Sequence, residues 1–387
     1  MELKKNLARI TEIVTSVDME TPEFLRSVVP PTYSTTVFRY TDFDMAEAHS
    51  AGKIRPHTYS RTDGNPTNEC LHRMMANMEN AEAAMAVASG TTAIFTAMIS
   101  CLKAGDHVVI DGGAYGRAQG FLCNEFARFG VTHTRVSLKE PGALEDALRP
   151  ETTLIYLESP NSWFFELQDI RHITKIARER GITTILDNTY STPVFQNPVD
   201  LGVDVVLHSA TKYLGGHSNV IAGIIVSTRK FIDSLSQVEG KLSAREASEL
   251  LVNLRTLPLR MERHQETARR VCFLLENSSR VKTVFWPGSE HYPQKDLFKS
   301  QMYGASGTMS FVLDCDREGT RRFINALRIV NLGGTWGTYE TTIQTTDTNP
   351  NYHRELFGLL PHHCRISVGL EDADALLEDL DSALRKI

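Results

Sequence analysis

A lysine stands in a segment whose composition suits covalent binding of an aldehyde cofactor. The residues from Ser209 to His217 read Ser-Ala-Thr-Lys-Tyr-Leu-Gly-Gly-His and follow a short β-branched run. The amino group of Lys212 could form a Schiff base with an aldehyde, while the hydroxyls of Ser209 and Thr211 could hold a phosphate. An isolated lysine is more often a surface residue. The strand end, the hydroxyls and the glycines favour the functional interpretation without deciding it.

A carboxylate follows another such run. Asp187 comes directly after residues 183–186 (Thr-Thr-Ile-Leu) and precedes Lys212 by 212 − 187 = 25 positions. An aspartate there can pair with the protonated nitrogen of a pyridine ring and keep the ring an electron sink. The alternative is a helix cap or a turn, which Asp-Asn serves well. The spacing, equal to one strand–helix–strand unit, favours the functional interpretation.

Two weaker signals precede these. Gly90 and Thr91 lie in Ala-Ser-Gly-Thr-Thr-Ala, which opens a predicted helix. The first N–H groups and the dipole of a helix attract an anion, although Ser-Gly-Thr is also a common N-cap. Tyr115 follows residues 107–110 and a Gly-Gly turn. Its ring could stack on a flat cofactor or pack under the loop.

The elements that position these residues alternate between strands and helices. Such alternation predicts an α/β domain with a mostly parallel sheet. Ligands bind beyond the carboxyl ends of strands in these sheets, which is where the four candidates stand. The predicted strands cover residues 107–110, 132–136, 153–157, 183–186, 204–207 and 223–226, and the predicted helices cover residues 116–129, 143–148 and 170–180.

The two ends of the chain have a different character. After about residue 230, four long helical patterns and two β runs predict a smaller α+β domain. The first 60 residues contain four prolines and little periodicity, which predicts an extended arm rather than a core element. The expected division is an arm over residues 1–60, a cofactor domain over 61–250 and a C-terminal domain over 251–387. The C-terminal helices are predicted at residues 244–254, 261–275, 318–327 and 372–385, and the strands at 308–313 and 364–368.

Composition excludes several classes of protein. The 387 residues carry a formal charge of 41 − 47 = −6, so no basic excess favours nucleic acid. The sequence has no run of 18 apolar residues, so no membrane helix is predicted, and the first residues lack the apolar stretch of a signal peptide. A cytoplasmic protein is expected. Neither a zinc site nor a disulfide framework fits the six dispersed cysteines, which are Cys70, Cys101, Cys123, Cys272, Cys315 and Cys364.

The candidates occur together with motifs that span nearly the whole chain. In this combination the sequence resembles the pyridoxal-phosphate enzymes of cysteine and methionine metabolism, which include cystathionine γ-synthase, cystathionine γ- and β-lyases and methionine γ-lyase. The motifs lie at residues 30–38 (PPTYSTTVF), 59–61 (YSR), 65–67 (NPT), 158–160 (ESP), 187–189 (DNT), 209–217, 254–257 (LRTL), 286–288 (WPG) and 365–372 (RISVGLED).

This resemblance implies a fold and a set of roles. The fold is that of fold type I, with a seven-stranded, mostly parallel sheet. Lys212 would carry pyridoxal 5'-phosphate and move the proton at the substrate Cα, and Asp187 would hold the ring nitrogen. Tyr115 would stack on the ring and assist at the leaving group. Arg365 would take the substrate carboxylate. The phosphate would be held by Gly90, Thr91, Ser209 and Thr211.

The resemblance also implies an oligomer. Tyr59 and Arg61 match residues that reach the cofactor phosphate, and for Tyr59 the substrate, of a neighbouring subunit. A homotetramer built as a dimer of dimers with shared active sites is therefore expected. No metal, membrane or nucleic acid is expected as a partner.

Several positions depart from the family pattern and bear on specificity. Ser162, before Trp163, stands where an asparagine near the cofactor's 3-oxygen is usual, unless Asn161 takes that place. Arg117 occupies a position near the tyrosine where small residues or cysteine are usual. Thr341 matches a serine that helps to position the lysine and is expected near the substrate. The segment between residues 341 and 365 is shorter than usual.

The expected function is β- or γ-elimination on an amino acid, most plausibly one that contains sulfur. The mixed motifs leave open γ-replacement, or elimination of an acyloxy group or halide in a specialised biosynthetic pathway. An aminotransferase is disfavoured because the Ser-Ala-Thr-Lys-Tyr segment belongs to the other branch. A catalytically inactive scaffold is disfavoured by the intact Lys212, Asp187, Tyr115 and Arg365.

Overall fold

The protein contains two sheets, and the larger one carries the predicted strands. The computed structural model describes residues 2–16, 27–235, 240–349 and 358–387. Seven strands form the larger sheet in the order β1-β7-β6-β5-β4-β2-β3, in which β7 is antiparallel to both of its neighbours and the other pairs are parallel. These strands are β1 (Ala83–Val87), β2 (His107–Asp111), β3 (Thr132–Val136), β4 (Thr152–Glu158), β5 (Thr183–Asp187), β6 (Val205–Ser209) and β7 (Gly223–Ser227).

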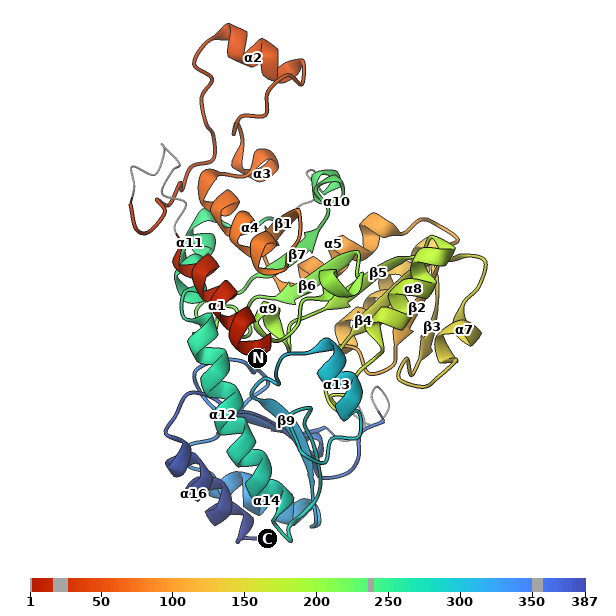
Figure 1. Cartoon of the computed structure of the whole chain (residues 1–387), viewed down its shortest axis with the longest axis vertical. Coiled ribbons are helices and arrows are strands. Elements are labelled where there is room, and N and C mark those ends of the chain that lie inside the picture. The colour runs from red at the N-terminus through yellow and green to blue at the C-terminus, as the bar shows by residue number, and fades with distance from the viewer. Residues whose placement is uncertain (1, 17–26, 236–239, 350–357) are drawn as a thin grey trace.

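Helices cover both faces of this sheet (Figure 1). Alternate residues of the central strands enter two separate cores, so both faces are apolar and the strands read as continuous hydrophobic runs. Leu186 and Val206 point into one core, and Ile185 and Val205 into the other. The helices of this part are α4 (Pro66–Met78), α5 (Gly90–Cys101), α6 (Gly116–Gly120), α7 (Ala143–Ala147), α8 (Ile170–Arg180), α9 (Thr192–Phe195), α10 (Arg229–Ser234) and α11 (Ala244–Leu254).

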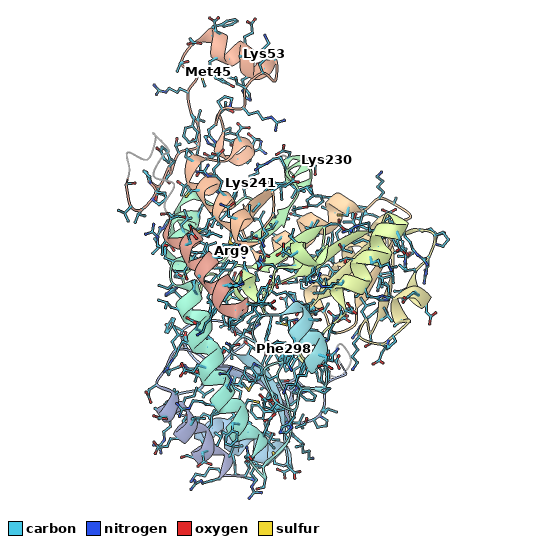
Figure 2. The ribbon with its side chains drawn as sticks, in the orientation of Figure 1. Arg9, Met45, Lys53, Lys230, Lys241 and Phe298 are labelled. Carbon is cyan, nitrogen blue, oxygen red and sulfur yellow. The ribbon has the colours of Figure 1, made fainter. Side chains whose placement is uncertain are left out.

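A second sheet of five strands forms the smaller domain. Its order is β10-β11-β12-β9-β8, and it has a core of its own. The strands are β8 (Val281–Phe285), β9 (Thr308–Leu313), β10 (Asn331–Leu332), β11 (Thr342–Thr345) and β12 (His363–Ser367), and the helices are α12 (Leu257–Glu276), α13 (Lys295–Gln301), α14 (Arg317–Ala326) and α16 (Ala373–Leu384). In Figure 2, Phe298 of α13 lies where this domain meets the larger one.

The long helix α12 connects the two domains. Its first turns, with Leu257 and Met261, contribute to the core of the large domain, and from Ala268 onward it contributes to the core of the small one. The boundary between the two hydrophobic cores therefore lies within α12. The predicted division at residues 250 and 251 stays a prediction.

The N-terminal region differs from its prediction. Helix α1 (Glu2–Thr15) places Leu7, Ile10 and Val14 in the large core, with 7%, 0% and 1% of their surfaces exposed. The prediction that the first 60 residues contain no core element is therefore wrong for α1. The stretch that carries α2 (Phe43–Ser50), by contrast, projects from the body, and Met45 and Lys53 mark its far end (Figure 2). The short helix α3 (Ser60–Asp63) lies at its base.

Elements of the large domain also differ from their predictions. The predicted helix over residues 116–129 consists of α6, a π-helical turn (Phe121–Glu125) and a 3₁₀ turn (Phe126–Phe129). The strand β1 was not predicted, because its sequence Ala-Ala-Met-Ala-Val is poor in β-branched residues. No helix in the described part of the chain combines the length and apolar character needed to cross a membrane.

Candidate active site

A cavity of about 270 Å³ lies beyond the carboxyl ends of β4, β5 and β6. Parallel strands bring their carboxyl ends to one edge of the sheet, so residues far apart in sequence meet there. Ten of the predicted site residues line this cavity: Gly90, Thr91, Tyr115, Asn161, Ser162, Asp187, Ser209, Thr211, Lys212 and Arg365.

Lys212 lies in the turn after β6, in the cavity wall. Its Nζ is 3.4 Å from Thr335 Oγ1 and 5.6 Å from the centre of the Trp336 ring. Burial, together with the positive charge of Arg365, lowers the pKa of Lys212 to about 8. An amine with this pKa is neutral often enough near physiological pH to act as a nucleophile or a base.

Asp187 is the last residue of β5 and lines the same cavity. Its Oδ1 accepts hydrogen bonds from the backbone N–H of Thr189, at 2.9 Å, and from the Thr189 hydroxyl. None of the described residues donates to the other oxygen, Oδ2. Burial raises the pKa of Asp187, and the two Thr189 bonds oppose that shift. A cation in the cavity would find an oriented carboxylate with one oxygen available.

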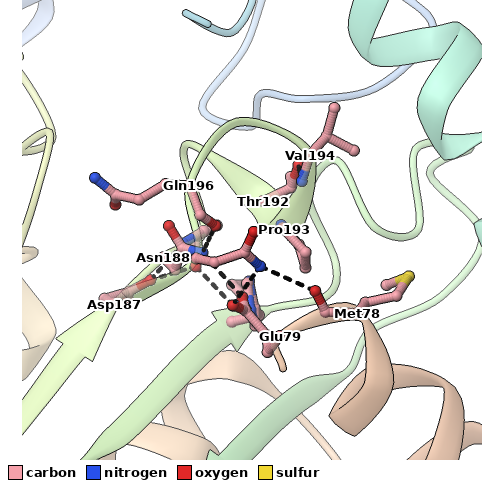
Figure 3. A network of polar contacts seen from close by, with 12 residues as sticks. Met78, Glu79, Asp187, Asn188, Thr192, Pro193, Val194 and Gln196 are labelled. Carbon is pink, nitrogen blue, oxygen red and sulfur yellow. Dashed lines mark hydrogen bonds and ion pairs between the residues drawn. The ribbon is translucent and has the colours of Figure 1, made fainter. Parts of the chain in front are cut away.

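A buried polar network lies behind Asp187 (Figure 3). The side-chain nitrogen of Asn188 donates to Glu79 Oε1 at 2.9 Å and to the carbonyl of Gln196 at 3.0 Å. His208 Nε2 lies 2.7 Å from the same Glu79 oxygen, and both side chains are fully buried. Because Asn188 directly follows Asp187, this network anchors the backbone that presents the carboxylate.

The first turn of α5 meets β6 at close range. Ser89 caps the helix by accepting from Thr92 N at 3.0 Å, which leaves the N–H groups of Gly90 and Thr91 without partners inside the helix. A Cβ on Gly90 would lie 2.6 Å from Ser209 Cβ, so only glycine allows the helix start to approach the strand end. The hydroxyls of Ser209 and Thr211 line the same corner of the cavity. This corner suits a phosphate.

Pyridoxal phosphate fits this set of residues. The glycine-lined helix start would hold its phosphate, and Lys212 would bind its aldehyde carbon. The available oxygen of Asp187 would face the ring nitrogen, whose positive charge offsets the burial of the carboxylate.

Arg365 comes from the second sheet, in β12. Its Nη1 donates to the carbonyl of Ser162 and its Nη2 to Gln344 Oε1, both at 2.9 Å. Its guanidinium carbon is 4.5 Å from the centre of the Trp163 ring. Burial lowers the pKa of Arg365 to about 10, which leaves it charged near neutral pH. A buried guanidinium at this position can bind a carboxylate.

Four further residues of the cavity wall are Tyr115, Glu158, Asn161 and Ser162. Tyr115 lines the cavity with 46% of its surface exposed. The hydroxyl of Ser162 donates to Glu158, a cavity residue to which the sequence analysis gave no role. Asn161 packs against Gly113 and contacts Glu166, at 3.4 Å from Nδ2 to Oε2. The signal for Glu158 was its place at a predicted strand end.

Other predicted residues lie outside the cavity wall. Tyr59 and Arg61 stand on the arm, with the Arg61 guanidinium carbon 5.3 Å from the centre of the Tyr59 ring. Thr341 is buried, and its hydroxyl donates to Glu371 Oε2 at 2.6 Å; Thr335 lies beside Lys212 instead. Arg117 pairs with Glu125 at 2.9 Å and lines a neighbouring cavity of about 510 Å³ that shares Tyr115 with the candidate site.

Comparison with known proteins gives consistent matches over the whole length. The family model described as Cys/Met metabolism PLP-dependent enzyme matches residues 11–385. An L-methionine gamma-lyase of Pseudomonas putida is 37% identical, covering 93% of this chain and 93% of that protein. A cystathionine gamma-lyase of Bacillus subtilis is 37% identical, covering 87% of this chain and 91% of that protein.

A solved structure has the same fold. A Campylobacter jejuni protein assigned as O-acetylhomoserine (thiol)-lyase superposes with a TM-score of 0.90 at 26% identity, over 97% of this chain and 100% of that one. It carries N'-pyridoxyl-lysine-5'-monophosphate, a lysine joined to the cofactor.

Proposed function

Because the chain belongs to the family of Cys/Met metabolism PLP-dependent enzymes, we propose that it eliminates a β- or γ-substituent from a sulfur-containing amino acid such as methionine or cystathionine. The observation that carries the proposal is the convergence of Lys212, Asp187 and Arg365 on one cavity. It is supported by the relatives named for γ-lyase activity on these two amino acids.

The cofactor supplies electron withdrawal, which stabilises the negative charge left at Cα when its proton departs. Lys212 takes that proton, and its lowered pKa of about 8 suits an amine that must both accept and return protons near neutral pH. For γ-elimination a second proton leaves Cβ, and we assign its removal to Lys212 as well. Tyr115, at the cavity rim, is placed to serve the leaving group.

Binding and orientation fall to the other cavity residues. Asp187 would hold the ring nitrogen of the cofactor and favour its protonated form, which would keep electron withdrawal strong. Arg365 takes the substrate carboxylate in a two-pronged pair and so fixes which Cα bond is broken. Gly90, Thr91, Ser209 and Thr211, which line the cavity, would hold the phosphate. Ser162 and Asn161 also line the cavity, and the Ser162 carbonyl accepts a hydrogen bond from Arg365. Thr341 lies outside the cavity wall, where its hydroxyl donates to Glu371.

The arm that carries Tyr59 and Arg61 is the basis for the proposed oligomeric state. Tyr59 and Arg61 lie outside their own cavity wall, which supports their reaching the active site of a neighbouring subunit. We include in the proposal a homotetramer arranged as a dimer of dimers, acting in the cytoplasm.

A second candidate is γ-replacement or elimination of a non-sulfur group such as an acyloxy group or halide. Two observations favour it. Arg117 lines the second cavity, which has Tyr115 in common with the candidate active site. The chain is also similar to a structure assigned as O-acetylhomoserine (thiol)-lyase.

The test is a substrate panel on the purified protein loaded with pyridoxal phosphate. It contains cystathionine, methionine, homocysteine, cysteine, O-acetylhomoserine and γ-halogenated amino acids, and both oxo-acid and amino-acid products are measured. Release of 2-oxobutyrate or pyruvate from a sulfur substrate as the fastest reaction supports the proposal. Faster turnover of O-acetylhomoserine or a halide, or a new amino acid as the main product, supports the second candidate instead.

A further inference from the structure

Glu158 occupies a central place among the residues of the active site, although the proposed reaction gives it no step. It ends β4 directly opposite Asp187, the last residue of β5, and lines the cavity with 7% of its surface exposed. A buried carboxylate is costly unless hydrogen bonds satisfy it. The hydrogen-bond partners of Glu158 therefore indicate its role.

Each oxygen of Glu158 accepts one hydrogen bond from a different segment of the active site. Oε2 accepts from the backbone N–H of Tyr115 at 2.6 Å, and Oε1 accepts from the hydroxyl of Ser162. The carbonyl of the same Ser162 accepts from Arg365 Nη1 at 2.9 Å. One carboxyl group thus joins the loop after β2, the loop after β4 and, through Ser162, strand β12 of the second domain.

We propose that Glu158 is a positioning residue that sets Tyr115 and Arg365 together, so that the ring-stacking group and the carboxylate-binding group keep one mutual geometry. This inference rests on the proposed function in one respect, since it takes the cavity to hold the family's cofactor and an amino acid. Displacements of about 1 Å in such groups can cost about a hundredfold in rate, so a single clamp on both has a large effect.

The surroundings of Glu158 give the clamp a dependence on pH. Burial raises the pKa of Glu158 to about 8, and the charge of Asp187 adds to the shift. The other charged groups that act on it are Asp111 at the end of β2 and Arg365 on β12. Loss of the Glu158 proton above about pH 8 places a negative charge beside Arg365. That charge weakens binding of a substrate carboxylate.

The experiment uses holoenzyme and L-norleucine, a methionine isostere without a leaving group. Binding is followed in the visible absorbance of the cofactor between pH 6.5 and 9.5, a range of ~3 units that spans the pKa of Glu158. Glu158→Leu removes both hydrogen bonds and should raise the Kd of norleucine about tenfold or more. Glu158→Gln keeps a carbonyl oxygen that can accept from the Tyr115 N–H and, like the protonated carboxyl group, a hydrogen that it can donate to the Ser162 hydroxyl oxygen, but it cannot ionise. It should bind within about threefold of wild type at pH 7 and lose the weakening above pH 8.

Asp204→Asn is the matched control, because Asp204 accepts from a backbone N–H and a hydroxyl, both of Thr184, at the opposite edge of the same sheet. It should leave norleucine binding and its pH profile unchanged. Wild-type binding in Glu158→Leu, or an unchanged pH profile in Glu158→Gln, overturns the proposal; if Glu158→Leu does not fold, Glu158→Gln alone decides. Norleucine is not cleaved, so failure of every substrate in the panel would refute the proposed function without affecting this readout.

Discussion

Lys212 shows how the fold converts an ordinary side chain into a reactive one. The amine lies in a cavity wall with Arg365 as a neighbouring charge, and both burial and that charge oppose its protonation. A lysine in water, with a pKa of about 10.4, is almost wholly protonated at pH 7. With a pKa of about 8, roughly a tenth of the Lys212 amines are neutral at that pH.

Attachment of pyridoxal phosphate to cofactor-free protein should therefore follow the titration of Lys212. The neutral amine is the nucleophile, so the attachment rate should rise about tenfold per pH unit below pH 8 and level off above about pH 9. Rapid-mixing absorbance measures the rate. Lys212→Arg, which keeps the charge, should attach no cofactor covalently. A rate still rising at pH 10 would show an ordinary lysine and contradict the prediction.

At the scale of elements, the active site depends on how closely α5 approaches β6. Gly90→Ala would put a Cβ 2.6 Å from Ser209 Cβ and Oγ and 2.8 Å from Ser209 Cα. Backbone atoms cannot swing away, so the helix start must shift from the strand end. We expect a loss of about 1–3 kcal/mol in the free energy of unfolding and a Kd for pyridoxal phosphate at least about tenfold higher, since about 1.4 kcal/mol of lost binding suffices.

Chemical denaturation and a titration with the cofactor measure these two effects. Gly120→Ala is the control, because a Cβ there would lie no closer than 3.8 Å to any atom beyond its chain neighbours and the backbone of its own helix. The residue also has helical backbone angles, with a negative φ. It should leave both quantities within error of wild type. Equal behaviour of the two variants would refute the steric argument.

The elements also show how far sequence reasoning reaches. The strands of the parallel sheet were predictable because β-branched residues recur between helical patterns, and the candidates after them were predictable because such strands end at a common edge. Helix α1 escaped prediction although Leu7, Ile10 and Val14 stand at helical spacing, since the prolines from residue 22 onward dominate that region.

Part of the site could not be read from local patterns. Thr335 and Trp336 reach Lys212 from a loop of the second domain, and only the tertiary fold brings that loop to the cavity. The same holds for the link from Glu158 through Ser162 to Arg365, because its members lie up to 207 positions apart (365 − 158 = 207). Family resemblance pointed to Arg365 and to Ser162, but not to the hydrogen bond between them.

At the scale of the whole molecule, the projecting arm bears on the proposal that neighbouring subunits complete each other's active sites. The arm leaves the body near α3 and extends away from it (Figure 1). It exposes apolar side chains, among them Val37 at 57% and Phe43 at 79%. Such surface favours burial against another subunit. If Arg61 acts in the neighbour's cavity, a chain in which Arg61 is replaced still has a Lys212 that can work once the neighbouring chain supplies an intact Arg61.

Two inactive variants should therefore restore each other. Arg61→Ala lacks the arm's contribution, and Lys212→Ala lacks the amine. In a mixed dimer, the pocket of the Arg61→Ala subunit receives an intact arm from its partner. Random pairing at equal amounts makes about half of the dimers mixed, each with one working site of two, so activity should recover to about one quarter of wild type. Co-expression with two different affinity tags isolates the mixed species for assay. Activity no greater than the sum of the separate variants would mean that each chain completes its own site.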